Sequence, residues 1–195
     1  EMSAIQHLIS PQTSDIGFPV QRLLPTAKIP AVGPFVFFDH MGPARFASEG
    51  TEGDVRPHPH IGLATVTYLY SGAMMHRDSL GHVQRIEPGA INLMAAGRGI
   101  VHSERVPADI RADQVAVQGI QIWLALPAER EEMEPAFHHY PAEALPTFTA
   151  EGVSLRLLIG SAFGLESPVV AHSPTLQADA ELAAGAIMEL PPDDL

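Results

Sequence analysis

The segments HPHIG (residues 58–62) and AGRGIVHSE (residues 96–104) enclose a run of short β-type segments and contain the most informative residues of the chain. Each includes a triplet of metal-binding type, His-x-His in the first and His-x-Glu in the second. Because side chains at i and i+2 point to the same face of a β-strand, each triplet directs two donor atoms the same way. Two such strands lying side by side would bring together three imidazoles and one carboxylate, those of His58, His60, His102 and Glu104.

The two triplets together favour a metal site over a chance arrangement. A single His-x-His on a strand is more often incidental, whereas two triplets separated by hairpin-like sequence are much harder to obtain by chance. Imidazole suits iron, copper, nickel and zinc, and a carboxylate adds negative charge and affinity for hard metals. Four protein ligands on an octahedral ion leave two positions free, which is typical of catalytic rather than structural sites.

Between the triplets the sequence predicts consecutive antiparallel strands. Thr, Val, Leu and Tyr are frequent up to Ser71-Gly72, which is a turn signal, and Pro88-Gly89 is another. The expected strands are residues 61–70, 74–78, 83–86 and 90–94. Short strands with frequent turns favour an all-β closed barrel or jelly roll, the architecture that cupins use.

Four segments resemble one family of two-barrel cupins, the pirins. They are GPFVFFDHMGP (33–43), HPHIG (58–62), AGRGIVHSE (96–104) and GIQIWLALP (119–127), so the resemblance covers most of residues 20–130. It implies a cupin double-stranded β-helix and an iron site with the ligands His58, His60, His102 and Glu104. The chain departs from the general cupin pattern at Ala64 and Thr65, where many cupins have a Glu shortly after His-x-His. The carboxylate ligand is then Glu104, as the resemblance to pirins also implies.

The resemblance implies a metal-dependent dioxygenase, because some pirins cleave flavonols such as quercetin with O₂ and release carbon monoxide. The expected cofactor is one divalent metal ion, Fe(II) in the first place, with Mn, Ni, Cu or Zn as alternatives. A flavonol hydroxyl could bind at an open position, where the charge of the ion would lower its pKa. Glu104 is the candidate catalytic base.

Two alternatives stay open, because fold and ligand set do not fix function. Some pirins are regulators that bind a transcription factor or a metabolic enzyme, with the oxidation state of iron changing their surface. This chain could therefore have a protein partner instead of a flavonol substrate. In a third interpretation the metal is purely structural.

The composition argues against several other classes of partner. The chain of 195 residues has a formal net charge of −12, and its 11 basic residues include a single lysine and no basic stripe. Direct nucleic-acid binding depends on clustered neutralisation of phosphates and is not expected. No apolar run approaches about 18 residues, the length that a membrane-spanning helix needs, and the lack of cysteine excludes thiolate ligands. We expect a cytoplasmic protein without membrane contact.

Three finer expectations concern the barrel itself. The apolar alternation in residues 115–126 changes parity, which places a β-bulge at Gly119. Asp39-His40 should follow a short strand, residues 35–38, at a turn. Continuing the even-numbered face beyond His60 gives either an apolar wall for a planar ligand or ordinary barrel core, formed by Ala64, Val66 and Tyr68.

The charged segment 128–134 is expected to be an inter-domain linker. Residues 1–134 would form the metal-binding cupin domain. Residues 135–195 would form the start of a second, metal-free cupin-like domain, in which His172 stands alone. The expected strands of this second part are 154–159, 169–171 and 186–190, too few for a whole barrel. The expected architecture is thus a bicupin with an incomplete C-terminal barrel, and homodimer formation through its unfinished sheet is one way to cover the open edge.

Overall fold

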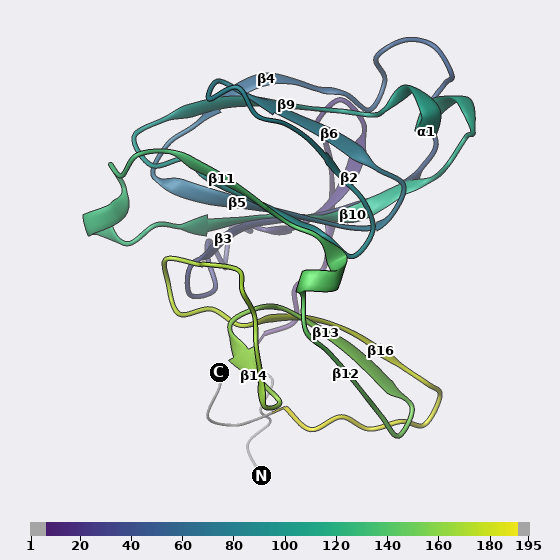
Figure 1. Cartoon of the computed structure of the whole chain (residues 1–195), viewed down its shortest axis with the longest axis vertical. Helices are drawn as coiled ribbons and strands as arrows, with labels where there is room; N and C mark the ends of the chain where they lie inside the picture. The colour runs from purple at the N-terminus through teal and green to yellow at the C-terminus, as the bar shows by residue number, and fades with distance from the viewer. Residues whose placement is uncertain (1–6, 191–195) are drawn as a thin grey trace.

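The computed structural model describes residues 7–190. Two of its antiparallel sheets face each other as a barrel (Figure 1). The larger sheet contains, in spatial order, β1 (Gln12–Asp15), β2 (Pro19–Leu24), β3 (Phe35–Ala44), β10 (Val117–Ala125), β5 (Leu63–Ser71), β8 (Ile91–Ala95) and β11 (Ala136–Tyr140). The smaller sheet contains β4 (Val55–His60), β9 (Ile100–Arg105), β6 (Met74–Asp78) and β7 (Val83–Ile86). A short helix, α1 (Ala108–Ala112), connects β9 with β10.

The C-terminal part lies below the larger sheet, on the side away from the smaller one (Figure 1). Two short 3₁₀ turns precede it, η1 (Ala128–Arg130) and η2 (Ala142–Ala144). Its main sheet contains β12 (Thr147–Ala150), β13 (Val153–Ile159) and β16 (Gln177–Leu182), and a small hairpin contains β14 (Ser161–Ala162) and β15 (Leu165–Glu166). Among residues 7–190 no helix is long and apolar enough to cross a membrane.

The prediction of an all-β fold with short antiparallel strands is confirmed. The four strands expected between the two triplets are β5, β6, β7 and β8, each within two residues of the predicted bounds. The β-bulge is also confirmed, since the pairing of β10 with both β3 and β5 changes register next to Gly119. A Cβ atom at Gly119 would clash with the carbonyl oxygen of Tyr68, so the close approach of the two strands requires glycine.

The predicted turn at Asp39-His40 is wrong, because β3 continues through these residues to Ala44. Strand β3 pairs with β2 on one edge and with β10 on the other, and both ladders include His40. Hydrogen bonding on two edges therefore extends the strand beyond its apolar run. The turn-like residues Gly42 and Pro43 fall inside the strand, near its end.

In the C-terminal part, one of three predicted strands is confirmed. Residues 154–159 lie in β13, whereas 169–171 and 186–190 have no strand structure. Val169 is buried although it pairs with no strand, so its apolar character reflects packing rather than sheet formation. The partner of β13 is instead β16, whose sequence QADAEL lacks β-branched residues and gave no signal. The division at residues 128–134 and the homodimer stay predictions.

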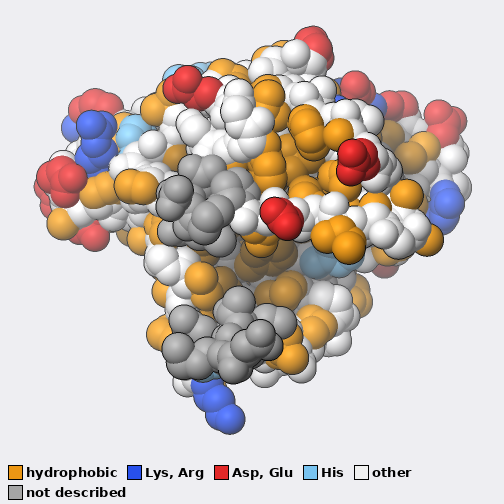
Figure 2. Space-filling model, turned by 90° about the horizontal axis from the view of Figure 1, so that it is seen from below, with side chains coloured by type: hydrophobic (Ala, Val, Ile, Leu, Met, Phe, Trp, Pro, Cys, Tyr) orange, Lys and Arg blue, Asp and Glu red, His pale blue; other side chains and the backbone are white. Residues whose placement is uncertain are grey.

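The larger sheet is buried on both faces. Its inner face, toward the smaller sheet, shares a core with that sheet in which Met41, Leu69 and Val117 pack with Met74 and Ile86. Its outer face packs against the C-terminal part, with residues of β5, β8 and β10 in one cluster with Leu145, Leu158, Ile159 and Val169. The view of the molecular surface from below in Figure 2 shows many hydrophobic side chains, with Lys and Arg near the margins of the view.

The apolar wall expected to continue the even-numbered face beyond His60 belongs to this outer face. Val66 and Tyr68 pack toward the C-terminal part, and Ala64 joins a small cluster with Ala95 and Leu126. The substrate-wall alternative is therefore wrong. The three side chains are buried core residues, as the other alternative predicted, but they lie on the outer face of the barrel rather than inside it. The odd–even alternation of faces counted from His60 does not continue into β5. The chain turns at Gly62, with φ +68°, and passes from the smaller sheet into the larger one.

Candidate metal centre

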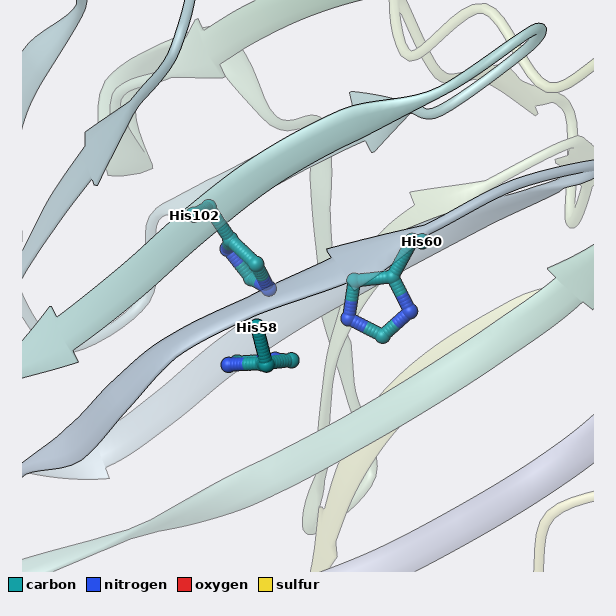
Figure 3. A group of neighbouring side chains, drawn as sticks. All are labelled: His58, His60 and His102. Carbon is teal, nitrogen blue, oxygen red and sulfur yellow. The ribbon is translucent and has the colours of Figure 1, made fainter.

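The pairing of β4 with β9 brings the two sequence triplets together. His58 lies directly opposite His102, and His60 opposite Ile100, as side-by-side strands require. The ring centroids of His58 and His102 are 4.4 Å apart, and each lies 4.9 Å from that of His60. One donor nitrogen from each ring lies within 4.8 Å of the others (Figure 3). The structure thus gathers three imidazoles from two strands at one point.

The ring nitrogens at this point lack the partners that buried polar atoms normally have. Nε2 of His60 and Nε2 of His102 are both buried and make no hydrogen bond. Nδ1 of His58 lies 2.8 Å from the carbonyl oxygen of Arg56; it must donate there, which leaves Nε2 of His58 with a lone pair. Buried nitrogens without partners cost free energy, and a cation bound between them would remove that cost. The donor set therefore fits a metal ion.

Glu104 lies beside the three rings but outside the tight group. One of its carboxylate oxygens, Oε1, is 3.7 Å from Nε2 of His102, and the other, Oε2, is buried without a hydrogen-bond partner. Burial raises the pKa of this carboxyl group to about 7. A neighbouring cation would reverse this effect, because positive charge stabilises the carboxylate. Its assignment as fourth ligand stays a prediction.

Burial also keeps the imidazoles of His60 and His102 neutral. It lowers the pKa of His60 to about 4, with a smaller contribution from His58, and it lowers that of His102 to about 2, with contributions from the surrounding histidines. Metal ligation requires the neutral ring, since a protonated nitrogen has no lone pair to offer. Because burial disfavours protonation of these rings, their lone pairs stay free to bind a cation.

A cavity of about 270 Å³ opens between the two sheets next to these residues. Trp123 stacks on Phe37 with 4.0 Å between ring centroids and meets His60 edge-on at 4.9 Å. A wider depression of about 860 Å³ shares Ile16, Val55 and His58 with the cavity, so the site opens to solvent on that side. The cavity is lined by Ile16, Arg22, Phe37, Asp39, Met41, Val55, His58, His60, Thr67, Met74, Glu104, Gln121 and Trp123.

Polar side chains in the cavity wall are already paired with one another. Arg22 donates to both carboxylate oxygens of Asp39 at 2.8 Å, and the hydroxyl of Thr67 donates to Oε1 of Gln121 at 2.6 Å. The Arg22 guanidinium also lies over the Phe37 ring, 4.4 Å from its centroid. The charges of Arg22 and Asp39 therefore compensate each other within the wall, and Thr67 and Gln121 satisfy each other.

Sequence reasoning missed several residues near the site. Phe37, Thr67 and Gln121 reach the cavity from three strands whose order in the sheet was not predictable, and Trp123 was noted only as lying off the apolar register. A buried histidine behind His102, His76, was also missed. Burial lowers its pKa. The signal available for it was a third alternating polar pattern, His76-x-Asp78, in a strand expected next to the triplets.

Two sheets closed into a barrel, with histidines from adjacent strands facing its interior, define a cupin-type protein. The family model "Pirin" matches residues 17–124, which is more than half of the chain, so the chain belongs to the pirin family. A pirin-like protein of Caulobacter vibrioides is 47% identical over 181 residues, covering 91% of this chain and 62% of the relative. The chain thus spans about three-fifths of that relative's length.

Solved structures agree with this assignment. A crystal structure of quercetin 2,3-dioxygenase from Acinetobacter baumannii superimposes with a TM-score of 0.82 and 38% identity, over 89% of this chain and 56% of the other. The bacterial pirin YhhW from Escherichia coli, in complex with nickel(II), has a TM-score of 0.55 at 18% identity, over 77% of this chain and 69% of the other. The second similarity is one of fold.

Proposed function

We propose that this protein is a metal-dependent dioxygenase that cleaves a flavonol-like aromatic substrate, with His58, His60, His102 and Glu104 holding one divalent ion, Fe(II) in the first place. The observation that carries the proposal is the group of three imidazoles beside the cavity, two of which, His60 and His102, are neutral and have buried Nε2 atoms without a hydrogen-bond partner among the described residues. The similarity to the quercetin 2,3-dioxygenase from Acinetobacter baumannii supports the same chemistry. When bound, the ion would supply positive charge that acidifies a substrate hydroxyl, together with redox chemistry toward O₂.

The cavity residues suit a flat, largely apolar ligand. The stacked pair of Phe37 and Trp123 forms a planar wall beside His60, against which an aromatic ring system can pack. Because Arg22 is neutralised by Asp39, the wall offers no free positive charge that would favour a carboxylate over a phenol. These features match a polyphenol better than a small organic acid.

Glu104 is the candidate acceptor for the hydroxyl proton of such a substrate. Its carboxylate lines the cavity, and Oε2 has no hydrogen-bond partner among the described residues that a substrate would need to displace. Transfer of the proton to Oε2 leaves an electron-rich phenolate, the form of a flavonol that reacts with O₂. The overall reaction consumes one flavonol and one O₂ and yields one ring-opened ester and one carbon monoxide.

The proposal is tested by loading the protein with Fe(II), Mn(II) or Ni(II) in turn and mixing it with quercetin under air. We expect loss of the flavonol absorbance with stoichiometric release of carbon monoxide, and no reaction in the metal-free protein. Metal-loaded protein that never consumes a flavonol would contradict the proposal and favour the regulatory alternative.

A further inference from the structure

Behind His102, on the side away from the cavity, a line of polar side chains runs toward the protein surface. Nδ1 of His102 lies 3.4 Å from Nδ1 of His76, and Nε2 of His76 lies 2.9 Å from Oδ2 of Asp78. His76 is 5% exposed and the Asp78 side chain is fully buried. Beyond Asp78 comes His82, whose side chain is 42% exposed. Nothing in the dioxygenase proposal uses these residues.

Asp78 is held by several donors at once. Its Oδ1 accepts the backbone N–H groups of Leu80 at 2.9 Å and His82 at 3.1 Å, and Nδ1 of His82 lies 3.0 Å from Oδ2. An ionised carboxylate can only accept hydrogen bonds. The nitrogen of His76 that faces it, Nε2, must therefore carry a proton and donate it to Asp78.

The orientation of His76 is fixed from a second direction. Phe137, on β11 of the larger sheet, stacks on the His76 ring with 4.2 Å between centroids and 14° between planes. The plane of the ring is thus held between the two sheets. A half-turn of the ring about its Cβ–Cγ bond would keep this stacking, so the hydrogen bond to Asp78 decides which edge of the ring faces the carboxylate.

A neutral His76 that is protonated on Nε2 has a lone pair on Nδ1, which faces Nδ1 of His102. Nδ1 of His102 then carries the proton of that hydrogen bond, and the lone pair of His102 lies on Nε2. This is the buried nitrogen without a partner that points into the group of three imidazoles. Each assignment in this line follows from the one before, starting at the carboxylate.

We propose that Asp78 and His76 are positioning residues that hold His102 in the tautomer whose Nε2 can bind the metal. The inference rests on the proposed metal site for its purpose, but the tautomer itself does not depend on a bound ion. His58 is set in the same tautomer by the Arg56 carbonyl oxygen, so two of the three imidazoles are oriented by the protein before any metal arrives. Partners that orient metal-binding histidines typically change metal affinity by about 10–100-fold when they are removed.

The substitution Asp78→Asn should exchange donor and acceptor in the hydrogen bonds of His76 to residue 78 and to His102. The backbone N–H groups of Leu80 and His82 would hold the amide oxygen at the position of Oδ1, so the amide nitrogen would face His76. His76 would accept there and donate through Nδ1, and His102 would then carry its proton on Nε2, where it blocks metal binding. His76→Phe keeps the stacking on Phe137 but removes both hydrogen bonds.

The test has two independent readouts. In ¹⁵N-histidine-labelled, metal-free protein, long-range ¹H–¹⁵N spectra should show His102 protonated on Nδ1 in the wild type and on Nε2 in Asp78→Asn. In Ni²⁺ titrations, both Asp78→Asn and His76→Phe should bind about 10–100-fold more weakly than the wild type. The matched control is His139→Phe, which removes a half-buried imidazole that is hydrogen-bonded to Asn92 at 2.7 Å and is not part of this line.

The wild-type spectrum decides the inference even if a variant does not fold. His102 protonated on Nε2, or His76 protonated on both nitrogens, in the wild type would overturn it. Nickel affinity of both variants within twofold of His139→Phe would overturn it as well. Wild-type protein that binds no Ni²⁺ but shows the expected tautomer would refute the proposed metal site and leave the positioning inference standing.

Discussion

The two faces of the larger sheet differ in what lies against them. On the inner face, Phe37, Thr67 and Trp123 border a cavity that His58, His60 and Glu104 of the smaller sheet also line. On the outer face, strand residues pack against Leu158 and Ile159, and the hydroxyl of Tyr68 donates to Asp179 at 2.7 Å. One sheet thus combines a face that packs against the C-terminal part with a face that borders the candidate metal centre. Substitutions on the two sides should therefore have separable effects.

The largest difference between the effect on metal binding and the effect on the fold is expected from His102→Ala. Removing one of three imidazoles should abolish most metal binding, while the fold should persist because the apolar clusters do not include this ring. Elemental analysis beside circular dichroism measures both effects. His40→Ala, on β3 outside the group of imidazoles, is the control, and full metal occupancy in His102→Ala would show the ligand assignment to be wrong.

Leu158→Ala should lower stability without changing metal binding, the reverse of what is expected from His102→Ala. Leu158 is 1% exposed in the outer core, so its truncation should lower the free energy of unfolding by about 2–5 kcal/mol, while metal content in the folded protein stays unchanged. Urea unfolding with metal analysis measures this. Leu182→Ala, at a side chain that is 47% exposed, should cost far less. A loss in Leu158→Ala no larger than that in Leu182→Ala would mean that burial of Leu158 in the outer core does not stabilise the protein.

Glu104→Gln tests the cavity side of the sheet through its effect on flavonol turnover rather than on metal binding. The substitution keeps the size of the side chain and one acceptor oxygen but removes its charge and basicity. Flavonol turnover should fall by roughly 10²-fold or more, the usual scale for loss of a general base, while metal binding weakens less because three imidazoles remain. Steady-state rates at matched metal occupancy measure this, with Glu87→Gln on the surface as control. Full activity in Glu104→Gln would exclude Glu104 as the base.

Tyr68→Phe should give the smallest change. It removes the hydrogen bond to Asp179 between barrel and C-terminal part but retains the buried ring, so unfolding should be easier by about 1 kcal/mol. Thermal unfolding compared with Tyr70→Phe, at a ring that is 42% exposed, measures the difference. A change in metal affinity in Tyr68→Phe would show that the two faces are coupled.

The sequence by itself determined the all-β class, the strands between the triplets and the bulge at Gly119, because strand alternation and turn residues are local properties. The convergence of His58, His60 and His102 was also predictable, since it needs only the i and i+2 geometry of two strands and their pairing. This prediction requires no other contact between distant residues.

The tertiary structure decided what surrounds these residues. Phe37 and Trp123 meet because β3 and β10 pair, and His76 is clamped because β11 crosses over β6 from the other sheet. The faces of Val66 and Tyr68 were set by the turn at Gly62, which moves the chain between sheets and interrupts the alternation counted from His60. Local periodicity fixes which side chains share a face of one strand, whereas the order of strands in a sheet depends on packing between distant segments.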